Sequence, residues 1–382
     1  MNYRKLGNTG LLVSEIGLGC EGFSEDGGKN TFPMIEAAER LGINYIDLYT
    51  PDPEVRGALG TSLKGKREKF ILQSHICSVW KDGQYKRSRD IDEVKEAMSD
   101  MLSLLKTDYI DVGMIHYVDS MEDWRTIAEG PVLKYVVNLK EKGIIKHIGL
   151  SSHNPEVALE AINTGHIEVL MFSVNPCYDL LPASEDVESL WDEKNYENHL
   201  VNMDPKRQEL YETCQSLGVG VTVMKAFGGG DLLSAELSLA GKALTVNQCI
   251  HYALTRPAVA TVLAGAHTIS ELEKSAAYEQ ASDEERDYVE AFAGFSNISW
   301  EGHCMYCSHC APCPKKIDVA TVTKFLNLAK AQGTVPETVR EHYKVLSHHA
   351  SECIGCRACE KRCPFGVHIV DNMSEAEKIF GI

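Results

Sequence analysis

Hydrophobic residues follow two alternating patterns between residues 13 and 280. Short runs rich in Val, Ile and Tyr, typical of buried strands, are each followed by a stretch whose apolar residues recur at three- and four-residue steps. That spacing is typical of an amphipathic helix, and "DIDEVKEAMSDMLSLL" (90–105) shows it clearly. The predicted strands are 13–20, 45–49, 69–76, 109–117, 147–153, 169–176, 219–226 and 259–265.

Strands that alternate with helices in this way favour parallel βαβ units. Eight such units are the number found in a (β/α)8 barrel, also called a TIM barrel. A doubly wound sheet is the alternative, but no G-x-G-x-x-G follows the first predicted strand. We therefore expect an α/β protein in which residues 1–295 form a (β/α)8 barrel.

Residues 178–205, "YDLLPASEDVESLWDEKNYENHLVNMDP", interrupt the alternation and show no clean period. A loop of this length in a compact domain is usually functional. It leaves the C-terminal end of the sixth predicted strand, so we expect it to overhang the face where barrels keep their active sites. The acids between Glu185 and Glu193 are equally well explained as a solvated surface.

Beyond residue 295 the strand pattern stops. Two helices are expected between two cysteine runs, over 319–333 and 336–349. We predict a second, small helical domain over 296–382, held together by metal because its core is small.

The cysteine runs have the spacing of iron–sulfur ligands. In two-cluster ferredoxins three cysteines at three-residue steps bind one 4Fe–4S cluster, and the fourth, which precedes proline, binds the other cluster. The first run is Cys304, Cys307, Cys310 and Cys313, and the second is Cys353, Cys356, Cys359 and Cys363. One predicted cluster is therefore bound by Cys304, Cys307, Cys310 and Cys363, and the other by Cys353, Cys356, Cys359 and Cys313.

Two zinc sites of four cysteines each are the alternative. Zinc sites prefer two C-x2-C pairs with a longer spacer between them, and these runs lack that arrangement. The remaining cysteines are isolated, and we expect them to be small buried apolar residues. They are Cys20, Cys77, Cys177, Cys214 and Cys249.

Charge and hydropathy exclude several classes of partner. Residues 300–382 hold ten basic and nine acidic residues, which gives them a net charge of +1. Because the formal net charge of the whole chain is −17, the first 299 residues carry a net charge of −18. Such an acidic surface repels phosphate backbones, and we expect no nucleic-acid partner. No run of about 18 apolar residues predicts a membrane span, and the N-terminus lacks the apolar stretch of a signal peptide. We expect a cytoplasmic protein with no membrane partner.

Polar residues gather where the predicted strands end, which is where a (β/α)8 barrel places its catalytic groups. Asp47 and Tyr49 are two residues apart, so both side chains face the same side of one strand. A single histidine at such a place is more often a bonded core residue, but several converging strand ends weaken that interpretation. The other polar residues are His75, His116, Ser151, Ser152, His153, Asn175, Lys225 and His267.

Residues 3–280 resemble the aldo/keto reductase family. The resemblance rests on "RKLGNTGLLVSEIGLGC", "GINYIDLY", "REKFILQSH", "TDYIDVGMIHY", "GIIKHIGLSSHNP" and "AVATVLAGAHTISELE". The C-terminal addition is similar to the branch of that family with a ferredoxin-like domain. The resemblance implies a (β/α)8 fold, NAD(P)H-dependent carbonyl reduction and a catalytic tetrad of Asp, Tyr, Lys and His.

The resemblance implies that Asp47 and His116 match the aspartate and histidine of the tetrad. Thr50 falls where tyrosine is expected, with Tyr49 as the nearest phenol, and His75 occupies the lysine position. Histidine titrates near neutrality without a lysine neighbour. We therefore hypothesise that His116 or His75 donates a proton, Asp47 orients the donor, and Tyr49 hydrogen-bonds the substrate.

The same resemblance gives candidate cofactor contacts. Ser151 and Ser152 fall where the family holds the nicotinamide carboxamide, while Met171 replaces a usual Gln. Lys225 and the glycines 228–230 are candidates for a phosphate or carboxylate site. The segment from Gly265 keeps the outline of the dinucleotide-phosphate site without its usual basic residues. The predicted cofactor contacts are Ser151, Ser152, Asn175, Lys225 and Gly265.

Electron counting leaves the mechanism open, because nicotinamide passes two electrons and each cluster passes one. A flavin would couple them, but no flavin motif is recognisable. We expect an iron–sulfur oxidoreductase that acts on a small carbonyl-type substrate, with NAD(P)H, a ferredoxin or another redox protein as electron partner. The alternatives are a non-catalytic electron carrier with a degenerate barrel, or a mononuclear metal site at Asp47, His75, His116 and His153.

Overall fold

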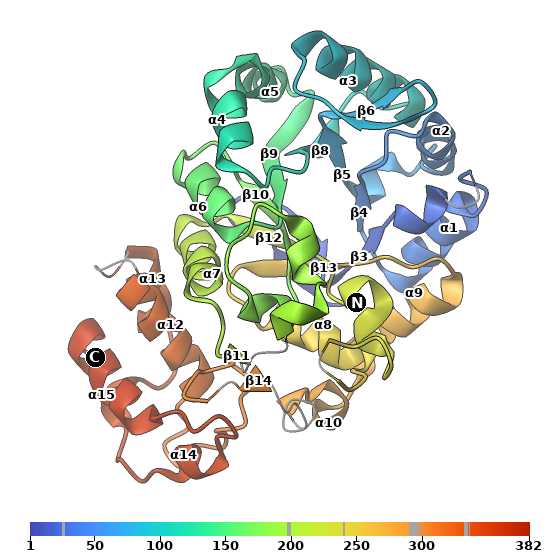
Figure 1. The fold of residues 1–382 in the computed structure, drawn as a ribbon. Coiled ribbons are helices and arrows are strands. Elements are labelled where there is room, and N and C mark those ends of the chain that lie inside the picture. The colour runs from blue at the N-terminus through green and yellow to red at the C-terminus, as the bar shows by residue number, and fades with distance from the viewer. Residues whose placement is uncertain are drawn as a thin grey trace.

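The computed structural model describes residues 1–24, 27–196, 200–239, 241–289, 298–299, 301–331, 335 and 337–382. Its larger part is a barrel with helices around it, and its C-terminal part lies against one side of that barrel (Figure 1). Among the described residues, no helix is both long and apolar enough to cross a membrane.

Eight parallel strands close the barrel, in the order β10-β12-β13-β3-β4-β5-β8-β9. Each strand pairs with the next barrel strand along the chain, and β13 closes the ring on β3. The predicted (β/α)8 barrel is therefore confirmed. The strands are β3 (Ile16–Gly19), β4 (Tyr45–Leu48), β5 (Ile71–Ile76), β8 (Ile110–Ile115), β9 (Ile145–Ser152), β10 (Val169–Ser173), β12 (Gly220–Met224) and β13 (Val259–Ala264).

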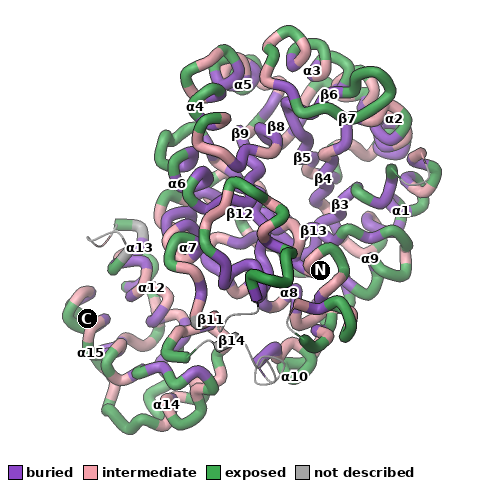
Figure 2. Tube along the Cα trace, viewed as in Figure 1, coloured by how far each residue is buried: buried purple, intermediate pink, exposed green. Residues whose placement is uncertain are grey.

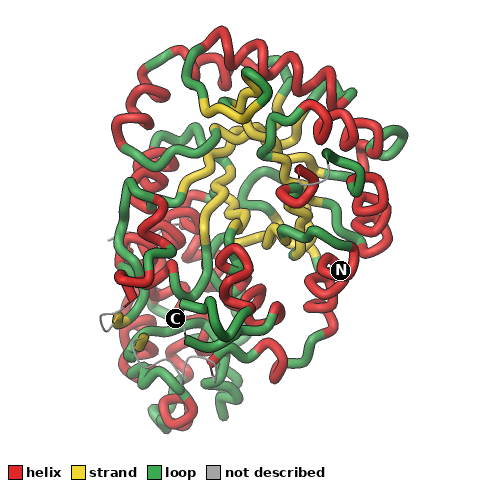
Figure 3. Tube along the Cα trace, turned by 45° about the vertical axis from the view of Figure 1, so that its right-hand side comes forward, coloured by secondary structure: helices red, strands yellow, loops and turns green. Residues whose placement is uncertain are grey.

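The helices surround the strands, which are buried, as Figures 2 and 3 show. Several begin soon after a strand at a residue whose side chain accepts a backbone N–H of the first turn, as Asp52, Asp90 and Asn154 do. These helices are α1 (Thr31–Leu41), α2 (Pro53–Ser62), α3 (Ile91–Leu105), α4 (Met121–Glu129), α5 (Pro131–Glu141), α6 (Pro155–Asn163), α7 (Pro205–Leu217), α8 (Val246–Leu254), α9 (Ile269–Ala276) and α10 (Asp283–Arg286).

Two antiparallel hairpins were not predicted. The first, β1 (Tyr3–Lys5) and β2 (Leu12–Ser14), precedes the barrel. The second, β6 (Ser78–Lys81) and β7 (Gln84–Arg87), follows β5 at its C-terminal end. Its turn is Asp82-Gly83, and the positive φ angles of both residues, 53° and 74°, suit the turn type that matches strand twist.

The long segment after β10 contains three short 3-10 helices and one short strand. Strand β11 (Leu200–Val201) pairs in parallel with β14 (Ile298–Ser299), and residues 197–199 lie outside the described residues. A carboxylate oxygen of Glu185 accepts the backbone N–H of Met121 at 3.1 Å, at the start of α4. Because α4 begins on the C-terminal side of β8, the segment reaches the predicted face of the barrel. The 3-10 helices are Tyr178–Leu180, Val187–Leu190 and Glu193–Tyr196.

The C-terminal part is helical and packs on the barrel. Helices α12 (Val319–Ala331) and α13 (Glu337–Lys344) correspond to the two predicted helices, while α14 (Ala358–Arg362) and α15 (Ile369–Phe380) were not predicted. Helix α12 packs against both α15 and α7, and α7 belongs to the barrel. The predicted boundary at residue 295 lies outside the described residues.

The close approach of α2 to α3 requires a residue without a side chain at position 60. A Cβ on Gly60 would lie 2.7 Å from Leu105 Cα and would also meet the carbonyl oxygen of Leu104. We expect Gly60→Ala to lower the free energy of unfolding by about 1–3 kcal/mol, because backbone cannot yield as a flexible side chain does. Chemical denaturation measures this change.

Gly57 provides the matched control in the same helix, because a Cβ there would meet no atom within 4 Å. Gly57→Ala should leave stability unchanged or raise it by up to about 1 kcal/mol through helix propensity. Equal losses in the two variants would show that helix packing at position 60 is not the cause.

Candidate active site and cysteine cavities

Four predicted side chains lie at neighbouring strand ends on the C-terminal side of the barrel. Asp47 is in β4, His75 is in β5 and His116 directly follows β8. Tyr49 follows β4, and its ring is stacked on that of His116 with centroids 6.2 Å apart. The closed barrel brings these strand ends together, as expected for a parallel sheet.

A chain of hydrogen bonds joins Asp47, His75, His116 and Tyr85. His75 Nε2 is 3.0 Å from Asp47 Oδ1, and His75 Nδ1 is 2.7 Å from His116 Nδ1. At the far end, the Tyr85 hydroxyl is 3.0 Å from His116 Nε2. Tyr85 lies on the unpredicted hairpin β6–β7 and is 44% exposed, so the chain runs from solvent to a buried carboxylate.

The burial of His116 fixes where the protons lie. Burial, with the neighbouring His75 and Arg89, holds the pKa of His116 well below its ordinary range, so its ring is neutral. The carboxylate of Asp47 can only accept, so His75 Nε2 donates to it. A neutral His75 then accepts at Nδ1 from His116 Nδ1–H, and His116 Nε2 accepts from the Tyr85 hydroxyl.

A proton added to His75 reverses the two hydrogen bonds that His116 makes, while the bond from His75 to Asp47 keeps its direction. His75 Nδ1 then donates to His116 Nδ1, and His116 Nε2 donates to the Tyr85 oxygen. Both arrangements satisfy every ring nitrogen in the chain. The chain can therefore carry one proton between the hairpin and Asp47.

Gln73 holds Asp47 in place from inside the barrel. Its Nε2 donates to Asp47 Oδ1 at 2.6 Å, while its Oε1 accepts the hydroxyls of Tyr45 and Thr222. Its Nε2 also lies 3.4 Å from the sulfur of Met171. Asp47 is only 3% exposed, and these bonds stabilise its charge in a poorly solvated position.

Tyr49 is a phenol that resists ionisation. Burial, with the carboxylates of Glu21 and Asp47, raises the pKa of Tyr49 to about 12. Thr50, at the sequence position of the family tyrosine, is buried, and its carbonyl accepts Arg56 Nε at 3.1 Å. Tyr49 is therefore a second phenol beside the histidine pair, in addition to Tyr85, and it suits hydrogen bonding better than proton exchange.

The serines at the end of β9 are bonded to the protein. Ser151 Oγ accepts the backbone N–H of Tyr117 at 2.9 Å, and Ser152 Oγ donates to Asp119 Oδ1 at 3.0 Å. His153 Nδ1 lies 2.9 Å from Asp119 Oδ2. Asp119 thus organises this strand end, and His153 stands apart from the Asp47 chain.

The remaining predicted cofactor contacts lie on the loops after β10, β12 and β13. Asn175 shapes two of these loops, since its Nδ2 donates to the Lys225 carbonyl and its Oδ1 accepts two backbone N–H groups. Gly228, Gly229 and Gly230 all have positive φ in the turn that follows Lys225. Gly265 is exposed after β13, and a Cβ there would lie 4.0 Å from a carboxylate oxygen of Glu21.

A mononuclear metal site at Asp47, His75, His116 and His153 gains no support from this geometry. His75 uses both ring nitrogens within the chain, and His153 is bonded to Asp119. Over the part of the chain that the structure describes, no three His, Cys, Asp or Glu side chains could share one metal ion.

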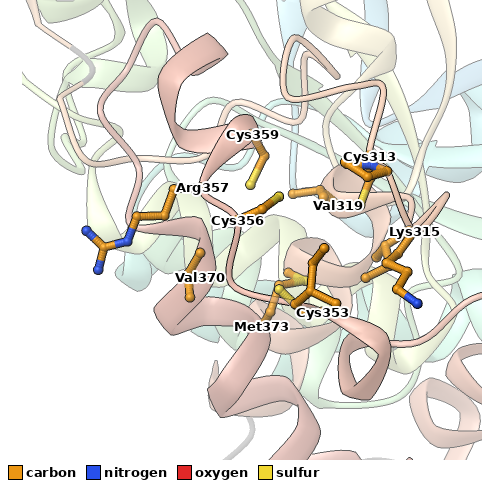
Figure 4. A pocket seen from close by; sticks show the side chains of 12 residues that line it. Cys313, Lys315, Val319, Cys353, Cys356, Arg357, Cys359, Val370 and Met373 are labelled. Atoms are coloured by element: carbon orange, nitrogen blue, oxygen red, sulfur yellow. The ribbon is translucent and has the colours of Figure 1, made fainter.

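The eight cysteines of the C-terminal part surround two cavities. Cys304, Cys307 and Cys310 of the first run line the first cavity together with Cys363 of the second run. Cys353, Cys356 and Cys359 of the second run line the second cavity together with Cys313 of the first, as Figure 4 shows in part. The last cysteine of each run thus belongs to the cavity of the other run.

Arg362 joins the two runs, since its guanidinium donates to the carbonyls of Cys310 and Pro312, both at 2.7 Å. The other residues around the cavities are largely apolar, among them Ile317, Val319 and Phe365. Four thiols around an apolar cavity fit a 4Fe–4S cluster, in which each iron binds a different cysteine.

The first cavity lies directly against the barrel. Arg256, which follows α8, donates to the Met305 carbonyl at 2.6 Å, and the Tyr288 hydroxyl donates to the same carbonyl at 3.0 Å. His309 Nε2 is 2.8 Å from Asp287 Oδ2. Arg256 is 1% exposed, so the barrel holds the first ligand loop through a buried cation.

Sequence reasoning missed Tyr85, Gln73, Asp119 and Arg256. The Asp-Gly turn between two short alternating runs was a signal for the hairpin that carries Tyr85. The contact of Arg256 with Met305 has no local signal, because the two residues are 49 positions apart.

Family comparisons match both parts of the chain. The aldo/keto reductase family matches residues 15–243, and the 4Fe-4S binding domain matches residues 347–367, which include the second cysteine run. The uncharacterized oxidoreductase YqkF of Bacillus subtilis (strain 168) is 32% identical over 289 residues, which cover 72% of this chain and 90% of that protein. L-galactose dehydrogenase of Arabidopsis thaliana is 24% identical over 306 residues, which cover 72% and 86%.

Solved structures give the same result. Aldo-keto reductase AKR11C1 from Bacillus halodurans (holo form) has a TM-score of 0.61 and 26% identity, and the alignment covers 76% of this chain and 96% of that one. A putative aldo-keto reductase from Pseudomonas aeruginosa shares the fold, with a TM-score of 0.56, 22% identity and coverage of 73% and 95%. This chain therefore belongs to the aldo/keto reductase family, and it is an oxidoreductase that carries a 4Fe–4S binding domain in its C-terminal part.

Proposed function

We propose that this protein reduces a small carbonyl-type substrate at the C-terminal face of the barrel with electrons that two 4Fe–4S clusters relay one at a time. The observation that carries the proposal is the pairing of the eight thiols around two cavities, with one cysteine exchanged between the runs. That exchange is the arrangement of two-cluster ferredoxins.

The first cluster would be held by Cys304, Cys307, Cys310 and Cys363, beside the barrel. The second would be held by Cys313, Cys353, Cys356 and Cys359, farther from it. When bound, the clusters supply single electrons. The contact of Arg256 with the first ligand loop supports transfer between that cluster and the barrel.

A carbonyl that is reduced by two single electrons takes up two protons, one at its oxygen and one at its carbon. The chain from Tyr85 to Asp47 would supply these protons one at a time. In this proposal the histidine pair holds the proton at a ring nitrogen, Asp47 orients His75, and Tyr49 hydrogen-bonds the substrate. Tyr85 connects the pair to solvent, which allows the chain to be reprotonated after each proton transfer.

NAD(P)H is the second candidate electron source, because family members usually bind it. Ser151, Ser152, Asn175, Lys225 and Gly265 would lie along that site. Ser152 already donates its hydroxyl proton to Asp119, and Glu21 lies beside Gly265, where its charge opposes a phosphate. These contacts favour the cluster relay over a nicotinamide as the direct donor.

Protein purified without oxygen should contain about eight iron and eight sulfide per chain, because each 4Fe–4S cluster contributes four of each. Cys310→Ala and Cys353→Ala remove one ligand from the first and the second set. Each should lose about half of the iron and sulfide. Colorimetric iron and sulfide assays measure the loss.

Cys214→Ala is the control, because Cys214 is a buried cysteine of α7 outside both cavities. It should keep the full iron content. Four iron atoms or stoichiometric zinc in the unaltered protein would contradict the two-cluster proposal.

His75→Gln and His116→Gln should each lower turnover by about 10²–10⁴-fold, since each breaks the chain that delivers the proton. The assay follows oxidation of reduced methyl viologen, and separately of NADPH, with a panel of small aldehydes and ketones. Tyr85→Phe should lower turnover less, because water can replace a half-exposed hydroxyl as donor.

His251→Gln is the matched control. His251 is likewise bonded to a tyrosine, with Nδ1 2.9 Å from the Tyr278 hydroxyl, but it is half-buried and lies outside the chain. Its turnover should match the unaltered protein. Undiminished rates in both His75→Gln and His116→Gln would eliminate the proton chain from the mechanism.

A further inference from the structure

The two cysteine cavities differ in their exposure to solvent. The first is covered on one side by the barrel, where Arg256 and Tyr288 bond to Met305 between two of its ligands. The second opens outward. Its ligand Cys356 is exposed, and the neighbouring Ile354 is 61% exposed although it is a large apolar residue.

The charge around the second cavity differs from that of the rest of the chain. Segments 313–317 and 353–363 contain five basic residues and one acidic residue, whereas residues 1–299 carry a formal charge of −18. Two charged side chains, Lys315 and Arg357, line this cavity, and Figure 4 shows both extending away from it. Both are exposed.

The one acid of these segments is turned toward the protein. Glu360 Oε1 accepts the backbone N–H of Val370 at 2.9 Å, at the start of α15. Its other oxygen is 3.8 Å from Arg357 Nε, a long contact for an ion pair, and the Arg357 side chain remains 70% exposed. The acids that flank the two segments, Asp318 and Glu352, bond to Thr321 and to His348. With both acids counted, the region still has five basic residues against three acidic ones.

We propose that the basic rim, defined as Lys315, Ile354, Cys356 and Arg357, is the docking surface for a small acidic protein that carries one electron at a time. The proposal rests on the proposed function, since it assumes a cluster in the second cavity. One electron leaves the reduced carrier and enters that cluster, so the carrier is oxidised by one electron and the cluster is reduced by one. No proton or bond is exchanged.

The short range of screened electrostatic interactions selects the sign of the partner's charge. At physiological ionic strength charges are screened beyond about 8 Å, so a docked carrier interacts with the rim more than with the acidic barrel. Lys315 and Arg357 would pair with carboxylates, and Ile354 gives the apolar contact between them. Transient electron-transfer complexes use small interfaces of this kind.

The experiment uses the iron-loaded full chain and an acidic plant-type [2Fe–2S] ferredoxin as the electron donor. Lys315→Glu, Arg357→Glu and the milder Arg357→Gln are compared with Lys378→Glu. Lys378 is an exposed lysine of α15, five residues beyond Met373, the last residue of that helix in the cavity lining, and therefore about 7.5 Å farther along the helix. It gives the same charge change as Lys315→Glu away from the rim.

Iron content and the electron paramagnetic resonance signals of the reduced clusters are recorded first, with reduction by deazaflavin and light, which needs no docking surface. These should be unchanged. Stopped-flow reduction by ferredoxin should then slow about tenfold or more in both charge-reversal variants, less in Arg357→Gln, and within about twofold of the unaltered protein in Lys378→Glu.

An electron acceptor with a basic surface should respond to the same substitutions in the opposite direction. Electron transfer from the reduced protein to cytochrome c should accelerate in Lys315→Glu and Arg357→Glu, because the reversed charges now attract it. Unchanged ferredoxin rates with intact cluster signals would overturn the docking proposal, as would an equal loss in Lys378→Glu. Unaltered protein without cluster signals would instead overturn the proposed function, and the docking proposal with it.

Discussion

Charge buried in the barrel wall has to be matched by charges or hydrogen bonds, and this constraint organises both the candidate active site and the attachment of the C-terminal part. Asp47 is matched by Gln73 and His75. Asp179, fully buried, accepts the hydroxyls of Tyr211 and Tyr252 at 2.6 and 2.7 Å, with Arg207 3.7 Å away. These bonds anchor the base of the long segment after β10 between α7 and α8, so the segment that reaches the barrel face is fixed at its origin by a buried carboxylate.

The same constraint sets the donor and acceptor of each hydrogen bond in the candidate active site. Because Asp47 can only accept, His75 must present an N–H to it, and the proton positions of His116 and Tyr85 follow in order. The sequence resemblance to the family implies a lysine, which lowers the pKa of a tyrosine, at the position of His75. Here a second histidine joins the first, and Tyr49 keeps a pKa of about 12. In the proposed mechanism a pair of imidazoles in contact therefore moves the proton in place of a phenol activated by a cation, through hydrogen bonds that can run in either direction.

The sequence predicted those parts of the molecule that repeat. Eight strands and their helices follow from a periodic pattern, and closure of a parallel barrel then places Asp47, His75 and His116 together without further information. The contacts that give the site its chemistry depend on segments outside the repeat. Tyr85 reaches His116 from a hairpin inserted after β5, and the direct bond between the two histidine rings depends on side-chain torsions that no spacing reveals. Helix α14 was missed because five residues among the ligands leave little room for a hydrophobic period. Helix α15 lies beyond the last cysteine, and its buried residues at three- and four-residue steps, Ile369, Met373, Ala376 and Phe380, were a signal that could have predicted it.

Arg256 links the barrel to the C-terminal part that binds to it. Its guanidinium is buried over the ring of Tyr252, at 4.5 Å, and donates to the carbonyl of Met305, yet among the described residues no carboxylate lies within ion-pair distance of it. Burial opposes the charge of Arg256, but Tyr252, Tyr288 and the buried carboxylate of Asp179 outweigh it and raise the pKa of the guanidinium. Thiolates and a cluster at the first cavity would add negative charge beside this cation, and a cation beside a cluster favours the state with one more electron. The second cavity has its basic residues in solvent, where their charges are screened and count for less. If both cavities hold clusters as proposed, Arg256 favours the presence of the electron on the cluster beside the barrel, which is the direction that the proposed relay needs.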